Sequence, residues 1–376
     1  MKNVVIAGYA RSPFTVANKG ALTRVRPDDL AAQVVGALVQ RTKVNPQDIE
    51  DLICGCAFPE GEQGFNIGRL IALLAGLPQS VAGMTVNRFC GSSMQSVHIA
   101  AGQIQLGAGE AFIAAGVESM SRVPMSGFNP MPNPALQPQH AYISMGDTAE
   151  NVARKWKISR AEQEAFAVRS QQRAAAAAKA GHFADEIVPI KGKAGVVETD
   201  GCPRPDTTAA GLAALKLAFT QEGTVTAGTS SPLTDGASAV LVCSEDYAAK
   251  HGLAPLARIR SVAVAGCAPE IMGIGPVAAT RKALQRANLD IAAIDVVELN
   301  EAFASQSLAC VRDLGIRDET LNIDGGAIAL GHPLGATGAR IVGKAASLLK
   351  RTGGRYALAT QCIGGGQGIA TILERI

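Results

Sequence analysis

The chain has 376 residues, more than one hydrophobic core usually serves, so two domains or one duplicated domain are expected. Hydrophobic residues make up 47% of the sequence and aromatic residues only 4%, which favours an α/β protein packed from small aliphatic side chains. A net charge of +3 is too small to indicate a nucleic-acid partner.

The cysteines and the apolar runs indicate the compartment. Eight cysteines in so long a chain are not a disulfide framework. Cys54 and Cys56 are interpreted as buried thiols, because no second pair or nearby histidine completes a zinc site. Residues 1–8 lead directly into a strand pattern without the core of a signal peptide, and no apolar run approaches the ~20 residues that span a bilayer. These features predict a cytoplasmic protein without a membrane span.

The first third of the chain predicts alternating helices and strands. A helix over 27–41 has proline in its first turn, and a strand ending at Gly55 follows it. A second strand over 82–88 runs into Cys90 and an alanine-rich helix, and a glycine-flanked strand follows over 111–116.

The middle of the chain has another character. Residues 121–145 are rich in Pro, Met and Asn without periodicity, which predicts a surface loop. Thr148 is the expected cap of the next helix, and Ser159 opens a capping box that begins another. Residues 191–215 return to loop composition. We expect 121–245 to be an inserted helical and loop region that covers the site and includes the return segment of the N-terminal half.

The last third repeats the order of the first. A helix over 276–287, a short linker and a strand over 293–300 are followed by a glycine loop with His332, a helix and a strand over 356–362. A period of about 245 residues indicates duplication of a domain. We therefore predict three parts, at 1–120, 121–245 and 246–376.

The duplication is expected to bring four polar residues together on comparable strand-to-helix loops. Cys90 precedes a predicted helix, whose dipole would favour the thiolate, although most lone cysteines are small core residues. His332 lies among glycines and before a proline, which favours a base over a structural histidine. Cys362 opens into glycines whose amides could stabilise an oxyanion. Asn300 could hold a water, whereas Glu301 would brace loops or a histidine.

Four motifs in order resemble the thiolase family over nearly the whole chain. They are Asn87-Arg-Phe-Cys-Gly-Ser-Ser, Asn300-Glu-Ala-Phe-Ala, Gly331-His-Pro-Leu-Gly-Ala-Thr-Gly and Cys362-Ile-Gly-Gly-Gly-Gln-Gly. The resemblance implies a five-layer α-β-α-β-α fold made of two duplicated halves with an inserted loop domain.

The resemblance also implies a role for each polar residue. Cys90 would take the acyl group, and His332 would deprotonate it and help form an oxyanion hole. Asn300 would hold the water that completes this hole. Cys362 would act as the acid and base, and the amides of Cys90 and Gly364 would form a second hole.

Five further positions resemble the family's substrate-binding residues. Arg204, Phe219 and Ser231 correspond to residues that bind CoA, and Met145 and Met272 to the methionines that border the acyl pocket. CoA would be a substrate, and two thiols with one imidazole would need neither a metal nor a bound cofactor.

Within the family, the chain is more similar to degradative 3-ketoacyl-CoA thiolases than to acetoacetyl-CoA thiolases. Many acetoacetyl-specific members have histidine where Ser144 stands, and residues 121–145 are shorter than their tetramer-forming loop. The resemblance therefore implies an acetyl-CoA C-acyltransferase that cleaves 3-ketoacyl-CoA with CoA, by a ping-pong route through an acyl-cysteine.

Three alternatives differ in chemistry. An acetoacetyl-CoA thiolase would condense two acetyl-CoA molecules, and a ketoacyl-ACP synthase shares the fold but is disfavoured by Cys362 in its glycine run. An inactive thiolase-like scaffold would have lost a catalytic residue. A homodimer or homotetramer is expected, and chain-length preference, direction and a dehydrogenase partner are left open.

Overall fold

A computed structural model describes residues 2–376. The strands are β1 (Val4–Arg11), β2 (Thr15–Val16), β3 (Ile49–Gly55), β4 (Ala82–Val86), β5 (Ala111–Ser119), β6 (Ile190–Gly192), β7 (Gly195–Val197), β8 (Thr234–Ser244), β9 (Ala257–Gly266), β10 (Val296–Leu299), β11 (Tyr356–Ile363) and β12 (Gln367–Glu374). The helices are α1 (Pro27–Thr42), α2 (Ile67–Leu74), α3 (Ser92–Leu106), α4 (Met145–Lys155), α5 (Arg160–Lys179), α6 (Ala209–Ala213), α7 (Glu245–Lys250), α8 (Gly275–Ala287), α9 (Ala304–Leu314), α10 (Ala327–Leu330) and α11 (Leu334–Thr352).

The strands form two similar half-sheets. The N-terminal half has the order β4-β3-β5-β8-β1, with β2 added beside β8, and the C-terminal half has the order β10-β11-β12-β9. In each half a parallel pair, β3 with β5 or β10 with β11, continues into antiparallel strands. The halves meet through a short antiparallel pairing of β1 with β9. The predicted duplication is therefore visible in the strand order itself.

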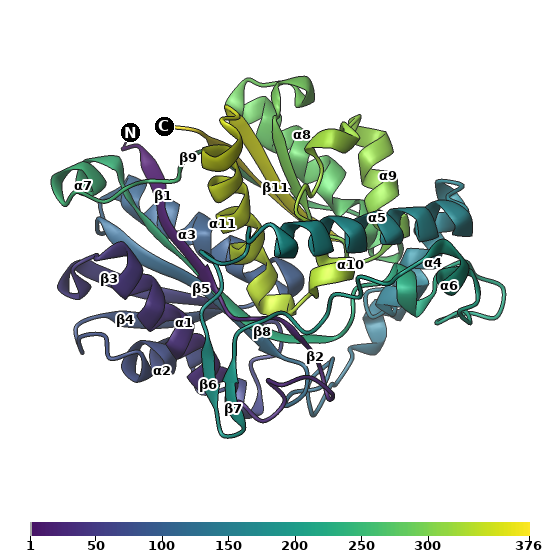
Figure 1. Cartoon of the computed structure of the whole chain (residues 1–376), viewed down its shortest axis with the longest axis horizontal. Coiled ribbons are helices and arrows are strands. Elements are labelled where there is room, and N and C mark those ends of the chain that lie inside the picture. Colours follow the sequence, from purple (N-terminus) through teal and green to yellow (C-terminus); the bar gives the residue numbers. More distant parts are fainter. Residues whose placement is uncertain (1) are drawn as a thin grey trace.

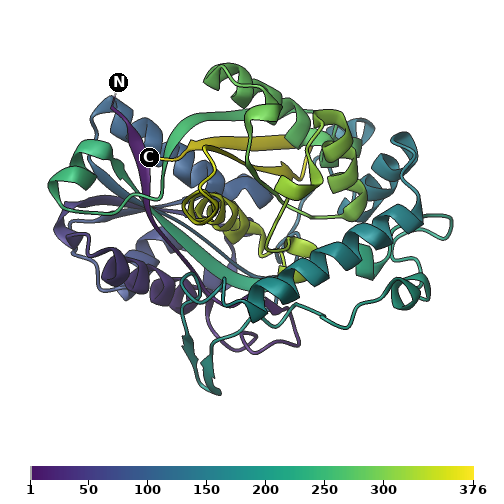
Figure 2. The same ribbon diagram turned by 45° about the horizontal axis from the view of Figure 1, so that its top comes forward.

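Helices and sheets alternate in five layers (Figure 1). Helices α1 and α2 cover the outer face of the N-terminal sheet, and α8 and α9 cover the outer face of the C-terminal sheet. Helices α3 and α11 pack together between the sheets, and Figure 2 shows α11 nearly end-on at this central position. The predicted five-layer α-β-α-β-α fold is confirmed.

Burial on both faces explains the apolar strands. In β5, Ile113 and Val117 belong to the core under α1, whereas Phe112 and Ala114 belong to the core around α3 and α11. Successive side chains of a strand point to opposite faces. A strand covered on both sides must therefore be apolar at nearly every position, as the parallel strands of α/β proteins are.

Glycine allows the two central helices and their neighbours to approach at backbone distance. A Cβ at Gly338 of α11 would lie 2.7 Å from the Met94 Cβ and 2.9 Å from the Met94 Cα of α3. A Cβ at Gly335 would lie 2.8 Å from the Cys56 Cα. The Ser93 hydroxyl accepts a hydrogen bond from the Ala339 amide at 2.8 Å across the same contact. The first turns of α3 and α11 are thus locked together.

Several local predictions are corrected. Ser144, not Thr148, caps α4: its hydroxyl accepts from the Asp147 amide at 3.2 Å, because the helix begins one turn earlier than expected. The capping box at Ser159 is confirmed. Residues 191–215 are not all loop, since they contain the end of the β6–β7 hairpin and α6.

The expectation that four site residues lie on strand-to-helix loops is half right. Cys90 lies between β4 and α3, and Asn300 between β10 and α9. His332 instead joins α10 to α11, because Gly331, with φ of +98°, ends the short helix before it. Cys362 lies inside β11, whose hairpin to β12 turns at Gly365 and Gly366, both with positive φ.

Residues 121–245 supply the cover of the C-terminal half. Helices α4, α5 and α6 and long loops lie in this stretch, and β8 then returns to the N-terminal sheet. The division at 120 and 245 stays a prediction. None of the helices within residues 2–376 has the length and apolar character needed to cross a membrane.

Replacing Gly338 tests the close helix contact. Gly338→Ala should lower the free energy of unfolding by about 1–3 kcal/mol, because the added methyl group meets backbone that cannot move independently. The matched control is Gly102→Ala in α3, where nothing lies within 4 Å of the added Cβ. That variant should be stabilised by up to about 1 kcal/mol. Urea unfolding measures both, and equal effects would contradict the proposed packing constraint.

Candidate active site

A cavity of about 820 Å³ lies where the two halves and the inserted region meet. Eight of the ten predicted site residues line it: Cys90, Met145, Arg204, Phe219, Ser231, Met272, His332 and Cys362. The other two, Asn300 and Gly364, contact residues of this set. Segments separated by more than 270 residues thus converge on one pocket.

Cys90 occupies a tight turn immediately before α3. The turn is a 3-10 helix over Phe89–Gly91, and Phe89 has a φ of +43°, a conformation that few non-glycine residues adopt. The Ser92 hydroxyl donates to the Phe89 carbonyl at 2.6 Å and accepts from the Arg88 amide at 2.9 Å. The Gln361 side chain donates to the Cys90 carbonyl. These bonds fix the thiol at the floor of the pocket.

Burial dominates the titration of Cys90. It raises the pKa of this thiol to about 11, although the Gly364 amide and the amide of Cys90 itself donate to the sulfur and oppose the rise. The prediction that the helix start would favour the thiolate is therefore wrong, because burial has the larger effect on the pKa. Loss of hydration destabilises the thiolate more than the hydrogen bonds from the two amides stabilise it.

His332 is held as a neutral imidazole with a defined orientation. Its Nδ1 lies 2.6 Å from the Thr337 hydroxyl, which in turn donates to the Pro333 carbonyl at 2.9 Å. The hydroxyl proton is thus used, so Nδ1 carries the proton and donates, and the lone pair is on Nε2. Burial, with a smaller effect from Arg340, lowers the pKa of His332 to about 3.

Asn300 lies beside the open nitrogen of His332. The side-chain Nδ2 of Asn300 is 3.3 Å from His332 Nε2, and the backbone amide of Asn300 donates to the Thr360 carbonyl at 3.0 Å. The Asn300 Oδ1 atom is buried and has no partner among the described residues. A buried amide oxygen without a partner is costly, so a water or a substrate group is expected there.

Cys362 is the more deeply buried thiol. It is fully buried near the end of β11, and burial, followed by the nearby Cys90, raises its pKa well above the usual value. Gly364 begins the hairpin turn after it, and a Cβ there would lie 3.6 Å from the Met145 sulfur. A side chain at position 364 would therefore be in van der Waals contact with Met145.

The predicted CoA-binding residues lie on the rim of the pocket. Arg204 is exposed, and its amide donates to the Gln171 side chain at 2.7 Å, which fixes the backbone that carries the guanidinium. Phe219 is 44% exposed and packs edge-on against Phe303, with ring centroids 6.0 Å apart. Ser231 donates to the Ala302 carbonyl from both its amide and its hydroxyl.

The predicted acyl-pocket methionines lie deeper. Met272 is buried and Met145 is half-buried, and both belong to one small apolar cluster with Phe303 and Cys362. An apolar lining next to two thiols suits an acyl chain attached to a reacting thioester. Glu301 does not contact the histidine: it accepts from Ser170 at 2.6 Å and from Asn322 at 2.8 Å, and so braces loops, one of the two roles predicted for it.

Comparison with known proteins agrees with this geometry. A sequence model described as "Thiolase, N-terminal domain" matches residues 4–246, and one described as "Thiolase, C-terminal domain" matches residues 253–375. The chain belongs to the thiolase family.

Relatives of this thiolase extend over its full length. It is 48% identical over 390 residues to a 3-ketoacyl-CoA thiolase of Bacillus subtilis and 50% identical over 386 residues to one of Vibrio cholerae, covering 100% of both chains in each case. It is also similar to the crystal structure of human mitochondrial 3-ketoacyl-CoA thiolase in complex with CoA, with a TM-score of 0.93 and 40% identity. That match covers 100% of this chain and 98% of the human one.

Two residues at the thiolase site were not singled out from the sequence. Thr337 orients His332, and Gln361 holds the Cys90 carbonyl. Thr337 lies inside the motif that begins at Gly331, five residues after His332, and Gln361 immediately precedes the motif that begins at Cys362. A hydroxyl in the first turn of a helix that follows a histidine is the available signal for Thr337.

Removing the Thr337 hydroxyl tests the orientation of the imidazole. Thr337→Val keeps the shape but deletes the partner of Nδ1, so kcat should fall about ten- to a hundredfold, a part of what a general base contributes. Thr337→Ser retains a hydroxyl and should stay near wild type. Steady-state kinetics and the melting temperature distinguish orientation of the imidazole from a purely structural role of Thr337. Equal activity of the wild type and both variants would contradict the orienting role.

Proposed function

We propose that this protein is a 3-ketoacyl-CoA thiolase, an acetyl-CoA C-acyltransferase that cleaves 3-ketoacyl-CoA with CoA into acetyl-CoA and an acyl-CoA two carbons shorter. One observation carries the proposal: Cys90, Cys362 and the neutral His332 share one cavity. The full-length identity of 48–50% to curated 3-ketoacyl-CoA thiolases supports it independently.

In the first half-reaction Cys90 attacks the 3-keto carbon. The thiol proton passes to His332 Nε2, the sulfur–carbon bond forms, and the keto oxygen becomes an oxyanion that the amides of Cys90 and Gly364 would stabilise. The C2–C3 bond then breaks, and its electron pair passes into an enolate whose thioester oxygen would lie in the hole formed by Asn300 and a water. Cys362 protonates C2, so that acetyl-CoA leaves and the acyl group remains on Cys90. The orphaned Asn300 Oδ1 supports the placement of a water in this oxyanion hole.

In the second half-reaction CoA completes the cycle. The Cys362 thiolate left by the first step takes the proton of the CoA thiol, which attacks the thioester carbonyl. The amides of Cys90 and Gly364, which donate to the Cys90 sulfur, would stabilise the oxyanion of this step as well. Cys90 leaves with the proton of His332, and both thiols return to their starting forms.

The perturbed pKa values fit a site that is neutral at rest. Burial raises the pKa of Cys90 to about 11 and lowers that of His332 to about 3, so proton transfer between them is unfavourable before substrate binds. Transfer coupled to attack on a carbonyl places the charge on an oxyanion instead. We propose that the thiolate forms only as the bond to substrate forms.

The edge of the N-terminal sheet and the cysteines bear on the oligomer and the compartment. β4 lies at the edge of the N-terminal sheet, beside the turn of Cys90, and its residues are half-buried to exposed. We propose at least a homodimer formed through this strand, with the tetramer left open by the short loop at 121–145. Free cysteines favour a cytoplasmic protein, and a role in fatty acid β-oxidation would follow from the proposed reaction.

A series of substrates tests the function. Ser144, which stands where many acetoacetyl-specific members have histidine, lines the pocket, caps α4 and contacts Asp147 at 2.8 Å. We expect cleavage of 3-ketoacyl-CoA chains longer than four carbons. The rate of CoA consumption is measured with 3-ketoacyl-CoA substrates of increasing chain length. Reaction with acetoacetyl-CoA alone would contradict this expectation and favour an acetoacetyl-CoA thiolase that works in the condensing direction. Complete inactivity would favour the scaffold.

The two thiols should separate when each is replaced. Cys90→Ser should form no stable acetyl-enzyme with acetyl-CoA, because a hydroxyl ionises far less readily than a thiol. Cys362→Ala should still be acetylated on Cys90, yet lose about a hundredfold or more in cleavage, because no group protonates C2. Mass spectrometry of peptides locates the label. An acetyl group on Cys362 of the wild type would reverse the assignment.

Arg204 tests the recognition of the CoA nucleotide. Its guanidinium is exposed at the pocket rim, where it suits a phosphate or a stacked base. Arg204→Ala should raise KM for CoA about tenfold and leave kcat nearly unchanged, because this contact is equally strong in the ground and transition states. Arg204→Lys keeps the charge and should lie between the two. An unaltered KM in Arg204→Ala would remove the residue from the site.

A further inference from the structure

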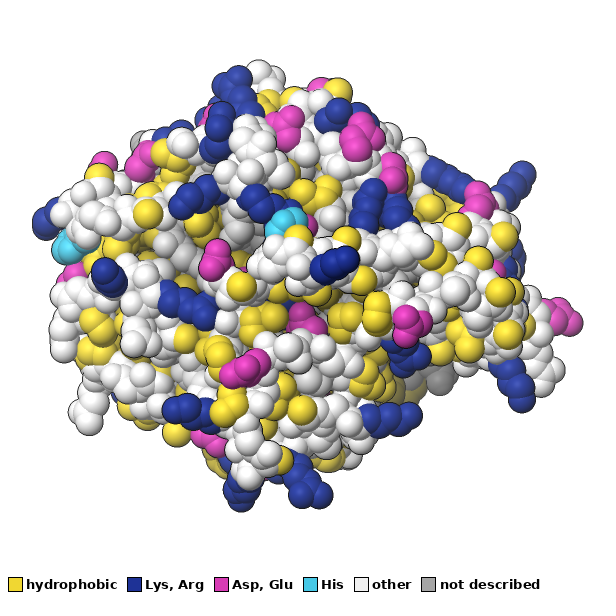
Figure 3. All heavy atoms as spheres, viewed as in Figure 1, with side chains coloured by type: hydrophobic (Ala, Val, Ile, Leu, Met, Phe, Trp, Pro, Cys, Tyr) yellow, Lys and Arg dark blue, Asp and Glu magenta, His cyan; other side chains and the backbone are white. Residues whose placement is uncertain are grey.

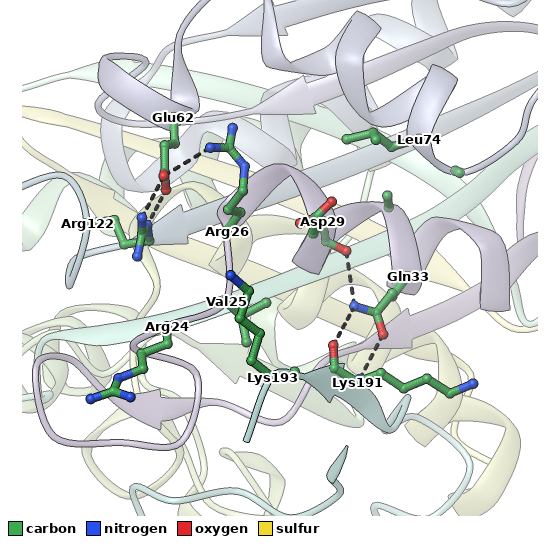
Figure 4. Close-up of a pocket in the computed structure, with 13 residues that line it drawn as sticks. Arg24, Val25, Arg26, Asp29, Gln33, Glu62, Leu74, Arg122, Lys191 and Lys193 are labelled. Atoms are coloured by element: carbon green, nitrogen blue, oxygen red, sulfur yellow. Dashed lines mark hydrogen bonds and ion pairs between the residues drawn. The ribbon is translucent and has the colours of Figure 1, made fainter. Parts of the chain in front are cut away.

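A second cavity of about 850 Å³ lies apart from the active site, and the two share no lining residue within 2–376. It opens between the start of α1, the end of α2 and the β6–β7 hairpin. Figure 4 shows its lining residues. We call it the α1–hairpin pocket.

Positive charge dominates this pocket. Its lining includes five basic side chains and two acidic ones: Arg24, Arg26, Arg122, Lys191 and Lys193, with Asp29 and Glu62. In the space-filling view, Lys and Arg side chains stand at the lower edge of the molecule, where the β6–β7 hairpin projects (Figure 3). For a chain with a net charge of only +3, this is a local concentration of charge.

Pairing within the pocket leaves three cations unused. Glu62 accepts from Arg26 at 3.0 Å and from Arg122 at 2.6 Å, as Figure 4 shows, and Arg26 also pairs with the neighbouring Asp28 at 2.7 Å. Arg24, Lys191 and Lys193 make no ion pair with any described side chain. Asp29 is the one remaining carboxylate in the lining, so the unpaired groups keep a positive potential in the cavity.

The walls that carry the lysines are fixed. The Gln33 side chain on α1 accepts from the Lys191 amide at 2.8 Å and donates to its carbonyl at 3.2 Å, which clamps the hairpin to the helix (Figure 4). A Cβ at Gly192 would lie 3.1 Å from a Val25 methyl group, so the hairpin packs closely on the segment before α1. The backbone of the hairpin is therefore held against α1, and Figure 4 shows the Lys191 ammonium group extending away from Arg24 and Lys193.

One wall of the pocket is apolar. Val25, Ala32, Leu74 and Ala75 contribute to the lining, and Leu74 is 52% exposed at the end of α2. A simple inorganic anion would leave this wall uncovered. A ligand with an apolar planar body and several negative charges would use both walls, and 850 Å³ is within the range of small-molecule sites.

We propose that the α1–hairpin pocket binds a nucleoside polyphosphate, with the phosphates near Arg24 and Lys193, the base against the exposed Leu74, and Lys191 adding positive charge at the pocket edge. Lysine and arginine are the usual phosphate-binding side chains. The inference is independent of the proposed thiolase activity, because the pocket shares no residue with the active site.

Calorimetric titration of the full-length protein with ATP tests the proposal at low and moderate salt. Lys191→Ala/Lys193→Ala should raise the dissociation constant for ATP about tenfold or more, which corresponds to a loss of at least about 1.4 kcal/mol. The control Lys250→Ala/Lys350→Ala removes two exposed lysines outside the pocket and should bind as the wild type does. Arg204→Ala should also retain the site, which separates it from nucleotide binding at the active site.

Four outcomes would overturn the proposal: no saturable binding of ATP, an equal dissociation constant in both double variants, loss of binding in Arg204→Ala alone, or equally tight binding of inorganic tripolyphosphate. Equally tight binding of tripolyphosphate would show that the apolar wall contributes nothing to the affinity and that the pocket recognises only the negative charge. Cleavage of 3-ketoacyl-CoA without ATP should be unchanged in Lys191→Ala/Lys193→Ala. A thiolase assay that failed in the wild type would refute the proposed function and leave the ATP result standing.

Discussion

The close backbone contact between α3 and α11 is the constraint on which the site depends. Cys90 lies two residues before the first residue of α3, and His332 lies two residues before the first residue of α11. The contact at Gly338 and Met94 lies in the first turns of the same helices, so it fixes the relative position of the predicted nucleophile and base with little chain between. Sheets on both sides bury most of the side chains near the start of this helix pair, and close-packed interiors transmit small displacements. A methyl group added at Gly338 would therefore displace the Cys90 thiol as well as lower the free energy of unfolding.

Two buried carboxylates connect the loops around this helix pair. Glu118, at the end of β5, accepts from the amides of Ala57 and Gly335 at 2.8 and 2.9 Å and from Gln63 at 2.8 Å. Glu301 plays the corresponding part in the other half, where it accepts from residues of three separate segments. A buried carboxylate is tolerable only when its oxygens are hydrogen-bonded. Each carboxylate thus accepts hydrogen bonds from several segments at once. It thereby holds together loops that have no regular secondary structure of their own.

Local sequence patterns predicted much of the fold, and tertiary contacts decided the rest. Proline at the start of α1, the capping box at Ser159 and the repeated helix–strand order are local signals, and all appear in the structure. The four polar residues around the pocket were found because each interrupts a glycine-rich or apolar run. The loops that carry His332 and Cys362 were misassigned, because a short helix and a hairpin there depend on glycines with positive φ. Thr337 and Glu118 were missed since their partners are distant or on another turn.

The same burial that makes the pocket apolar also sets its resting charge state. Water exclusion raises the pKa of Cys90 and lowers that of His332, so the ion pair found in some cysteine enzymes is disfavoured here. Under the proposed mechanism this cost of desolvation is offset, because the amides and the Asn300 side chain would need little rearrangement when an oxyanion forms. Preorganised dipoles without free water stabilise a charge that exists only during bond formation more than one that exists at rest. The thiol and imidazole are therefore neutral at rest and are held in place by the contact between α3 and α11. From this state, such a site would stabilise the negative charge of the transition state more than that of a free thiolate.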